Sequence, residues 1–340
     1  MGWKGAIRSI SAEIRRQERA AARRAREAER QWKAQQKAAA SEAARYEVAA
    51  YEAYIETLTS IHRESSDPID WEAIRARPEP VMPAEPVPVD TSRSAAARAE
   101  LDGFEPGFFE RLFGLKGRRT RLENALEEQL AAEEQLRHQQ ASAHLAAVEA
   151  WKTARDQWSD LGELADRILG GDVEAYGDVI RAAGCFDELG GVIGNQSMEI
   201  DFADGKAEVR VAVLEDSVVP TEQKSLTKGG KVSLKKLPAT RKLELYQDYV
   251  CGAALRIARE LFAVTRVSGV LVHVSGALLN TSNGHFEQTT ILSVYCPREK
   301  LESVGWEQVD ASDLIGSLMH AMKVRRGKGF GAVAHFEMPG

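Results

Sequence analysis

The chain has 340 residues, of which 44% are hydrophobic and 28% charged, and its formal net charge is −6 at pH 7. This length exceeds what one hydrophobic core usually needs, so we expect two domains. The negative net charge argues against a uniformly basic nucleic-acid-binding protein, although residues 1–37 hold eleven Lys or Arg against four Glu.

The cysteines and the apolar runs indicate the compartment. Cys185, Cys251 and Cys296 are odd in number and far apart. Their spacing favours reduced thiols in a core over a disulfide framework or a zinc site. No run reaches the roughly eighteen apolar residues of a membrane span, and the start of the chain lacks a signal-peptide pattern. We therefore expect a cytoplasmic protein without a cofactor, unless it is the magnesium enzyme considered below.

The first predicted element is one very long helix over residues 7–62, within a first region of residues 1–66. No glycine occurs between Gly5 and Gly103, and strong helix formers dominate. At about 1.5 Å per residue, such a helix would reach roughly 80 Å. Its clearest apolar stripe consists of Val48, Tyr51, Ile55 and Leu58. We expect another helix to cover this stripe, because a domain of this size cannot wrap a helix of that length.

The beginning of this helix allows more than one interpretation. Apolar side chains at positions 3, 7, 10 and 14 oppose a cationic face, which is the pattern of a helix lying on a membrane surface. The simpler interpretation is that the helical rod merely begins there. Arginines over residues 15–30 either contact phosphates or form a solvated face with Glu18, Glu27 and Glu29 as partners.

A Pro-rich connection and an aromatic cluster follow, over residues 67–117. Six prolines lie between Pro68 and Pro88. The aromatic cluster consists of Phe104, Phe108, Phe109, Leu112 and Phe113. We interpret it as packing at the end of a helical hairpin, with a partner-docking patch as the alternative.

A second long helix is predicted over residues 119–169, within a region of residues 118–170. Two long helices with a connection between them favour an antiparallel hairpin or coiled coil within the chain. Pairing between two chains is the alternative, and we expect a homo-oligomer. The heptads are irregular and rich in alanine, so register and oligomeric state stay open.

The last region, residues 171–340, predicts a small α+β domain with a mostly antiparallel sheet. Expected strands cover residues 198–202, 207–214, 269–275, 289–295 and 332–337, and expected helices cover residues 173–183, 243–264 and 311–322. Asp204-Gly205 predicts a hairpin turn. The helix face with Leu245, Tyr249, Ala253, Ile257 and Leu261 is expected to cover the sheet.

A cationic loop is expected over residues 224–242. It holds seven basic residues and no acid: Lys224, Lys228, Lys231, Lys235, Lys236, Arg241 and Lys242. Because these charges repel one another, a bound polyanion would stabilise the loop, and nucleic acid is the commonest one. A solvated, mobile loop is the alternative interpretation.

Glu222-Gln223-Lys224, directly at this loop, spells an acid-x-Lys element. A carboxylate can hold Mg²⁺ while a neighbouring lysine positions the attacking water. With a hairpin upstream and a helix and strand downstream, the order resembles the restriction-endonuclease-like (PD-(D/E)xK) core over residues 173–276. The resemblance implies a metal site at Glu222 with Asp216 or Asp201, and catalysis by Glu222, Lys224 and Asp216.

The sequence is therefore consistent with two main functional hypotheses and a third one. The first is a coiled-coil interaction or scaffold protein that binds a protein partner or a polyanion, with nucleic acid expected, through the cationic segment. The alternative is a magnesium-dependent nuclease, and because bacterial antiphage systems often join a coiled rod to such a nuclease, antiphage defence would be its setting. A membrane-surface scaffold acting through residues 1–16 is a third hypothesis.

Overall fold

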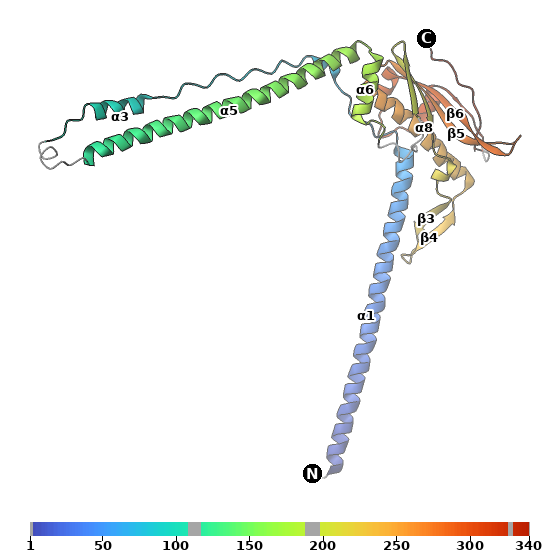
Figure 1. The fold of residues 1–340 in the computed structure, drawn as a ribbon. Helices are drawn as coiled ribbons and strands as arrows, with labels where there is room; N and C mark the ends of the chain where they lie inside the picture. The colour runs from blue at the N-terminus through green and yellow to red at the C-terminus, as the bar shows by residue number, and fades with distance from the viewer. Residues whose placement is uncertain (1–2, 108–116, 188–197, 326–328, 340) are drawn as a thin grey trace. The chain divides into compact units, whose positions relative to one another are not determined.

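The computed structural model describes residues 3–107, 117–187, 198–325 and 329–339. The side chains at positions 3–20 and 22 are outside the description. The chain divides into two compact units, Met1–Ile69 with Gly171–Gly340 and, separately, Asp70–Gly170. The described part forms eight α-helices and a mostly antiparallel five-stranded sheet, which confirms the mixed fold class (Figure 1). None of the described helices combines the length and the apolarity that crossing a bilayer demands.

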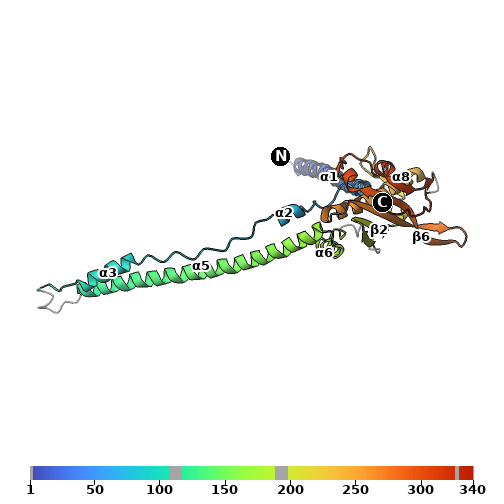
Figure 2. The ribbon, with the colours of Figure 1, turned by 90° about the horizontal axis from the view of Figure 1, so that it is seen from above.

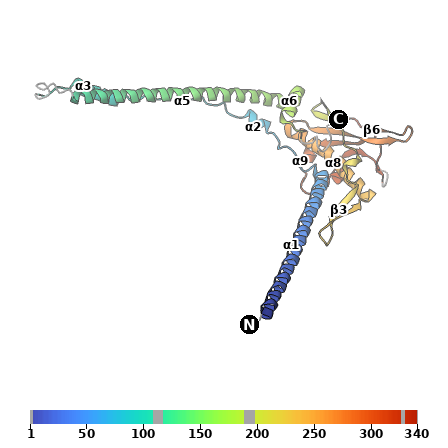
Figure 3. The same cartoon turned by 60° about the horizontal axis from the view of Figure 1, so that its bottom comes forward.

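The helix α1 (Trp3–Ser60) is continuous, as the absence of glycine after Gly5 predicts. Its apolar stripe is buried in the last third of the helix, at Ala44, Val48 and Leu58. The covering elements are the helix α8 (Ala239–Val264) and a β-hairpin of the same unit, so the stripe has a partner that is not the second long helix (Figure 3). The predicted coiled-coil hairpin of the two long helices is not confirmed.

Close packing of α1 on α8 depends on a glycine. A Cβ atom at Gly252 would lie 2.4 Å from Cγ2 of Ile61, which is closer than real Cβ contacts come. From Leu245 to Val264 almost every residue of α8 is buried, including Tyr249 and Ile257, because the helix packs on strands of the sheet as well as on α1. Burial of large apolar side chains at about 25 cal/mol per Å² makes α8 the centre of the core of this unit.

The five-stranded sheet has the order β1-β2-β5-β6-β7. Its strands are β1 (Met198–Ala203), β2 (Lys206–Ala212), β5 (Gly269–Asn280), β6 (His285–Pro297) and β7 (Met319–Met322). Only β2 and β5 run parallel; the other neighbours are antiparallel. Val209, Val272 and Val294 lie in one cross-strand row and are fully buried. The helix α6 (Val173–Ala183) also packs on α8, and its Tyr176 contacts Phe202 of β1.

Three sequence predictions in this unit were wrong. The helix expected over residues 311–322 ends early as α10 (Ala311–Ser317), because Met319–Met322 turns into the edge strand β7 and pairs with β6. The strand expected over 332–337 is not formed; among the described residues, its contact with the sheet is a backbone bond from Val333 N to Thr290 O at 3.0 Å and a side-chain bond between His335 and Thr290. The cationic segment is not a loop but the hairpin of β3 (Glu222–Leu226) and β4 (Val232–Lys236).

Short elements complete this unit. They are the 3-10 turn η1 (Asp216–Val218), the helix α9 (Arg298–Glu302) and the two-residue strands β8 (Val324–Arg325) and β9 (Gly329–Phe330). All three cysteines are buried and free, as their spacing predicts.

The other unit is built around α5 (Gly117–Leu169), accompanied by α2 (Trp71–Arg75) and α3 (Ser92–Asp102). The Pro-rich segment between α2 and α3 is more than a connection, because it runs extended along α5 (Figure 2). The indole N–H groups of Trp151 and Trp158 donate to the carbonyls of Pro80 at 2.9 Å and Arg77 at 2.8 Å.

The extended segment has three half-buried residues, at positions that differ by multiples of three. They are Pro80, Pro83 and Val89, whereas Pro86 of the same series, Val81 and Val87 are exposed. A spacing of three matches the polyproline II helix, whose carbonyls have no internal partners and are free to accept the indole bonds. At the end of α3, Phe104 lies under the Arg118 guanidinium, 5.8 Å from its ring centroid. The remaining members of the predicted aromatic cluster, Phe108, Phe109, Leu112 and Phe113, lie outside the described residues.

Candidate nucleic-acid interface

The β3–β4 hairpin positions most of the cationic segment. Its register pairs Glu222 with Lys236 and Leu226 with Val232. At the turn, the Thr227 hydroxyl accepts from the Lys231 N–H at 3.1 Å, and the Thr227 N–H donates to the Lys231 carbonyl at 2.9 Å. These bonds close the turn around Gly230, whose φ of 72° favours glycine. The lysines of the hairpin therefore stand on ordered backbone.

The hairpin packs against the last third of α1. A Cβ atom at Gly230 would lie 2.5 Å from Oγ of Ser41, so the turn touches the helix there. Further along, Nζ of Lys224 donates to Oε1 of Glu47 at 2.7 Å. Oη of Tyr54 donates to the Val218 carbonyl at 2.7 Å. The hairpin thus contacts α1 from Ser41 to Glu47, about two turns, and η1 extends the contact to Tyr54.

The seven predicted binding cations divide into two groups. Lys224 pairs with Glu47, Arg241 with Glu244 at 3.2 Å, and Lys242 with Asp216 at 3.0 Å. The other four are exposed and have no ion pair within the part of the chain that the structure describes: Lys228, Lys231, Lys235 and Lys236. The surface available to an anion is therefore the turn and the β4 strand of the hairpin.

A cleft of about 690 Å³ lies between the hairpin base and α1. Asp216, Glu222 and Lys224 line it together with Tyr51 and Tyr54. Burial raises the pKa of Tyr51, against a smaller lowering by the Arg241 charge. The three residues predicted to be catalytic thus line one cleft. Asp216 comes from η1, and Glu222 and Lys224 come from β3.

The arrangement departs from the endonuclease-like expectation in two ways. Glu222 and Lys224 stand on the separate two-stranded sheet and not on a strand of the five-stranded core. Asp201 lies elsewhere, on β1, where its Oδ2 accepts from Nη1 of Arg210 at 2.8 Å. No group of three His, Cys, Asp or Glu side chains suited to a metal ion was found among the described residues. Three carboxylates line this cleft, Glu47, Asp216 and Glu222, and Glu47 is paired with Lys224.

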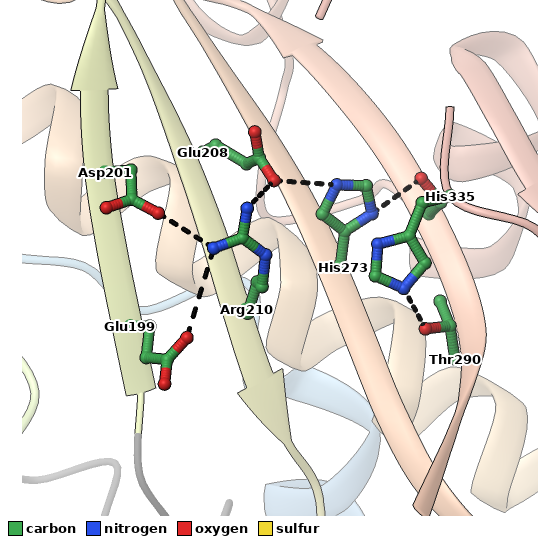
Figure 4. A network of polar contacts seen from close by, with 8 residues as sticks. Glu199, Asp201, Glu208, Arg210, His273, Thr290 and His335 are labelled. Carbon is green, nitrogen blue, oxygen red and sulfur yellow. Dashed lines mark hydrogen bonds and ion pairs between the residues drawn. The ribbon is translucent and has the colours of Figure 1, made fainter. Parts of the chain in front are cut away.

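Sequence reasoning missed a polar network on the five-stranded sheet (Figure 4). Nδ1 of His273 lies 2.9 Å from the Ser293 hydroxyl, and its Nε2 lies 3.5 Å from Glu208. Glu208 in turn accepts a bond from Arg210. Burial, followed by the neighbouring His335, lowers the pKa of His273 to about 4. A histidine inside the apolar run Val-Leu-Val-His-Val was the available signal.

The network is closed over and does not form an accessible nucleophile. Ser293 is fully buried, and His273 is 2% exposed. The ring of His335, from the C-terminal segment, stacks on His273 with 4.2 Å between centroids. The same segment is held at both ends, by the Val333–Thr290 backbone bond and by Lys206 donating to the Pro339 carbonyl. The seryl hydroxyl therefore has no route to a substrate in this state.

A second cavity, of about 470 Å³, opens beside the start of α8. Most of its lining residues are apolar, among them Leu278, Phe286 and Phe330, and Lys242 and Asp216 also line it. The same ion pair thus borders both cavities.

Comparisons with models of known protein families, with curated protein sequences and with solved structures found no match for this chain. The functional argument therefore depends on the geometry and charge described above.

Proposed function

We propose that this chain is an interaction protein that binds a polyanion, with nucleic acid as the class, through the β3–β4 hairpin. The observation that supports this proposal is the set of four exposed hairpin lysines that lack ion pairs in the described part of the chain. A hairpin fixed on α1 loses less conformational entropy on binding than a mobile loop would. The long helices then act as scaffold elements, with protein partners or a second copy of the chain as their ligands.

The test compares two double variants of equal charge. Lys228→Gln/Lys231→Gln removes two hairpin cations, and Lys300→Gln/Lys323→Gln removes two exposed cations elsewhere in the same unit. With a fluorescent DNA or RNA probe, the hairpin variant should bind more weakly. Its plot of log affinity against log salt should become shallower by up to about 0.9 for each phosphate that the variant no longer neutralises. Equal binding by both variants, or no binding by the unmodified protein, would overturn the proposal.

A magnesium-dependent nuclease is the second candidate, because Asp216, Glu222 and Lys224 line one cleft. In that function Glu222 and Asp216 would hold the metal and Lys224 would position the attacking water. Glu222→Gln should abolish cleavage of plasmid or RNA in Mg²⁺ while leaving the mobility shift unchanged. Cleavage that survives Glu222→Gln and Lys224→Ala would exclude this site as its source.

A further inference from the structure

Beyond the hairpin, α1 carries its own cationic row. Every described side chain between positions 21 and 40 is exposed. Five cations among them follow spacings of three and four residues: Arg23, Arg26, Arg30, Lys33 and Lys37. At about 100° per residue, these five positions fall within an arc of about 80°. We call them the α1 cation row.

The α1 cation row lies on the same face of the helix as the buried stripe. Continuing the count of about 100° per residue from Arg23, the positions of Ser41, Ala44 and Val48 fall inside the same arc. The structure places those residues against the rest of the unit, and Gly230 of the hairpin turn touches Ser41. One straight face of α1 therefore changes from cationic to apolar where the turn with Lys228 and Lys231 meets it.

This charge pattern disfavours pairing of the row with a second copy of α1. In a coiled coil, the five cations would occupy the a and d positions, where two chains would bring like charges together. Glu29 neutralises one member in part, through an exposed pair with Lys33 at 2.6 Å. Such a pair contributes little, so phosphate can replace the carboxylate. The partner that fits a row of cations is a polyanion.

The α1 cation row lies on a straight, rigid helix, and this shape favours some classes of nucleic acid as ligands over others. From Arg23 to Ser41 it spans about 27 Å, given a rise of about 1.5 Å per residue. Proteins bind single strands largely by stacking bases on aromatic rings. Trp32, the aromatic side chain in this stretch, lies about 180° from Arg23, on the opposite side of the helix. The major groove of B-form DNA admits an α-helix, whereas the corresponding groove of A-form RNA is too narrow.

We infer that the α1 cation row and the lysines of the hairpin turn form one continuous surface that binds the phosphates of duplex DNA. This inference rests on the proposed function and adds to it the ligand class and the contribution of α1. The two parts act together because the packing of the hairpin on Ser41 fixes the turn at the end of the row.

The first test replaces single arginines that are close in sequence but differ in direction. Arg26→Gln removes a member of the row, and Arg24→Gln removes an exposed cation about 140° from the centre of the row. With a duplex DNA probe of about 20 base pairs, Arg26→Gln should weaken binding several-fold and lower the salt slope by about 0.9. Arg24→Gln should change neither quantity measurably. Equal effects of the two variants would overturn the inference.

The second test changes the direction in which the α1 cation row points relative to the hairpin, by inserting residues between them. Two alanines inserted after Ala39 turn the row by about 200° relative to the hairpin and move it by about 3 Å, whereas four alanines turn it by only about 40° but move it by about 6 Å. Alanine keeps the helix intact. If the surface is continuous, the two-residue insertion should weaken duplex binding more than the four-residue insertion. The opposite order, or equal affinities, would overturn the inference.

Competitors added at equal phosphate concentration identify the ligand. Duplex DNA should displace the probe better than single-stranded DNA, duplex RNA or vesicles with anionic headgroups; better displacement by any of these three would overturn the choice of duplex DNA. The proposed function fails separately. If Lys228→Gln/Lys231→Gln loses binding while Arg26→Gln does not, the hairpin binds without the row, so the inference falls and the proposed function stands.

Discussion

At the scale of single residues, the most consequential group is a charged pair in the core. Nε of Arg256 donates to Oε1 of Glu260 at 2.6 Å, and the two side chains are 6% and 0% exposed. The same carboxylate oxygen accepts from the N–H of Ser66 at 3.1 Å, just beyond α1. Arg259 donates to the carbonyl of Arg63 at 2.7 Å. Charged side chains of α8 therefore hold the chain that leaves α1.

Removing one member of this pair should cost more than removing both. Glu260→Leu leaves the Arg256 guanidinium buried without its main partner, so we expect the free energy of unfolding to fall by about 3 kcal/mol. The double variant Arg256→Met/Glu260→Leu removes both charges and should be more stable than Glu260→Leu alone. Urea unfolding followed by circular dichroism measures both values. A double variant less stable than the single one would contradict this account.

His273 should make the fold sensitive to mild acid. Its pKa is about 4 in the folded chain, below the ordinary value of about 6.5, because burial, the nearby His335 and the smaller effect of Arg210 outweigh Glu208. The unfolded chain therefore binds the proton first, and stability should fall as the pH drops from about 6.5 to about 4. The loss from this residue approaches about 3 kcal/mol.

The comparison that isolates this effect uses His273→Gln. Between pH 7 and pH 4.5, its stability should fall less than that of the unmodified chain, as measured by urea midpoints. His285→Gln, an exposed change on the same sheet, is the control and should follow the unmodified chain. Parallel curves for all three proteins would show that His273 does not titrate as expected.

At the scale of elements, the hairpin turn offers a matched pair of glycines. Gly230 and Gly284 both have positive φ, at 72° and 75°, in turns of two different hairpins. An added Cβ would collide with Ser41 only at Gly230; nothing lies within 4 Å of the corresponding position at Gly284. Gly284→Ala should therefore show the backbone cost alone, about 1 kcal/mol.

Gly230→Ala should cost more, and it should specifically loosen the hairpin from α1. Hydrogen exchange of β3 and β4 should become faster in this variant than in Gly284→Ala. Ser41→Gly removes the obstructing hydroxyl and should restore much of the protection when combined with Gly230→Ala. Equal exchange in the two alanine variants would show that the turn does not depend on its contact with α1.

Many of the helices and strands could be predicted from the periodicity of apolar residues in the sequence. The bounds of α6 agree with the sequence prediction, and the buried face of α8 contains the apolar residues expected there. The β3–β4 hairpin was missed because β3, Glu-Gln-Lys-Ser-Leu, has one apolar residue and shows no apolar alternation, and because β4 ends in two adjacent lysines. Strand β7 was missed because it pairs with β6 across the sheet, and such a partner is not visible in a local window of sequence.

The candidate site was predictable in content but not in arrangement. Its cations could be read directly, whereas the ion pairs of Lys224 and Lys242 join residues distant in sequence. That Glu47 of α1 pairs with Lys224 of the hairpin could be learned only from the folded structure. The same holds for the Pro-rich segment, whose packing on α5 depends on two indole donors about seventy to eighty residues away.

At the scale of the whole molecule, net charge and local charge oppose each other. The α1 cation row and the seven cations over residues 224–242 contribute twelve positive charges, so the remainder of the chain carries a formal charge of −18. At physiological ionic strength, charges farther apart than about 8 Å are largely screened. A bound polyanion would therefore respond to the local cations and hardly to the total.

Chromatography at pH 7 should detect both the negative net charge and the local cationic surface of the protein. The chain should bind an anion exchanger because of its net charge of −6, and also a heparin column because of its cationic surface. Lys228→Gln/Lys231→Gln should elute from heparin at lower salt. Lys300→Gln/Lys323→Gln, with the same net charge, should elute as the unmodified protein does. Retention that follows net charge alone would contradict a local surface.

The pairing of the Pro-rich segment with α5 also restricts how this protein can evolve. Trp151 and Trp158 are seven residues apart, about 10.5 Å along a helix, and their carbonyl partners are three residues apart, about 9 Å in a polyproline II helix. Natural variants should therefore change length in the Pro-rich segment and in α5 together, by three residues in the segment for every seven in the helix. Homologous sequences that keep this ratio would show that selection preserves the two indole bonds.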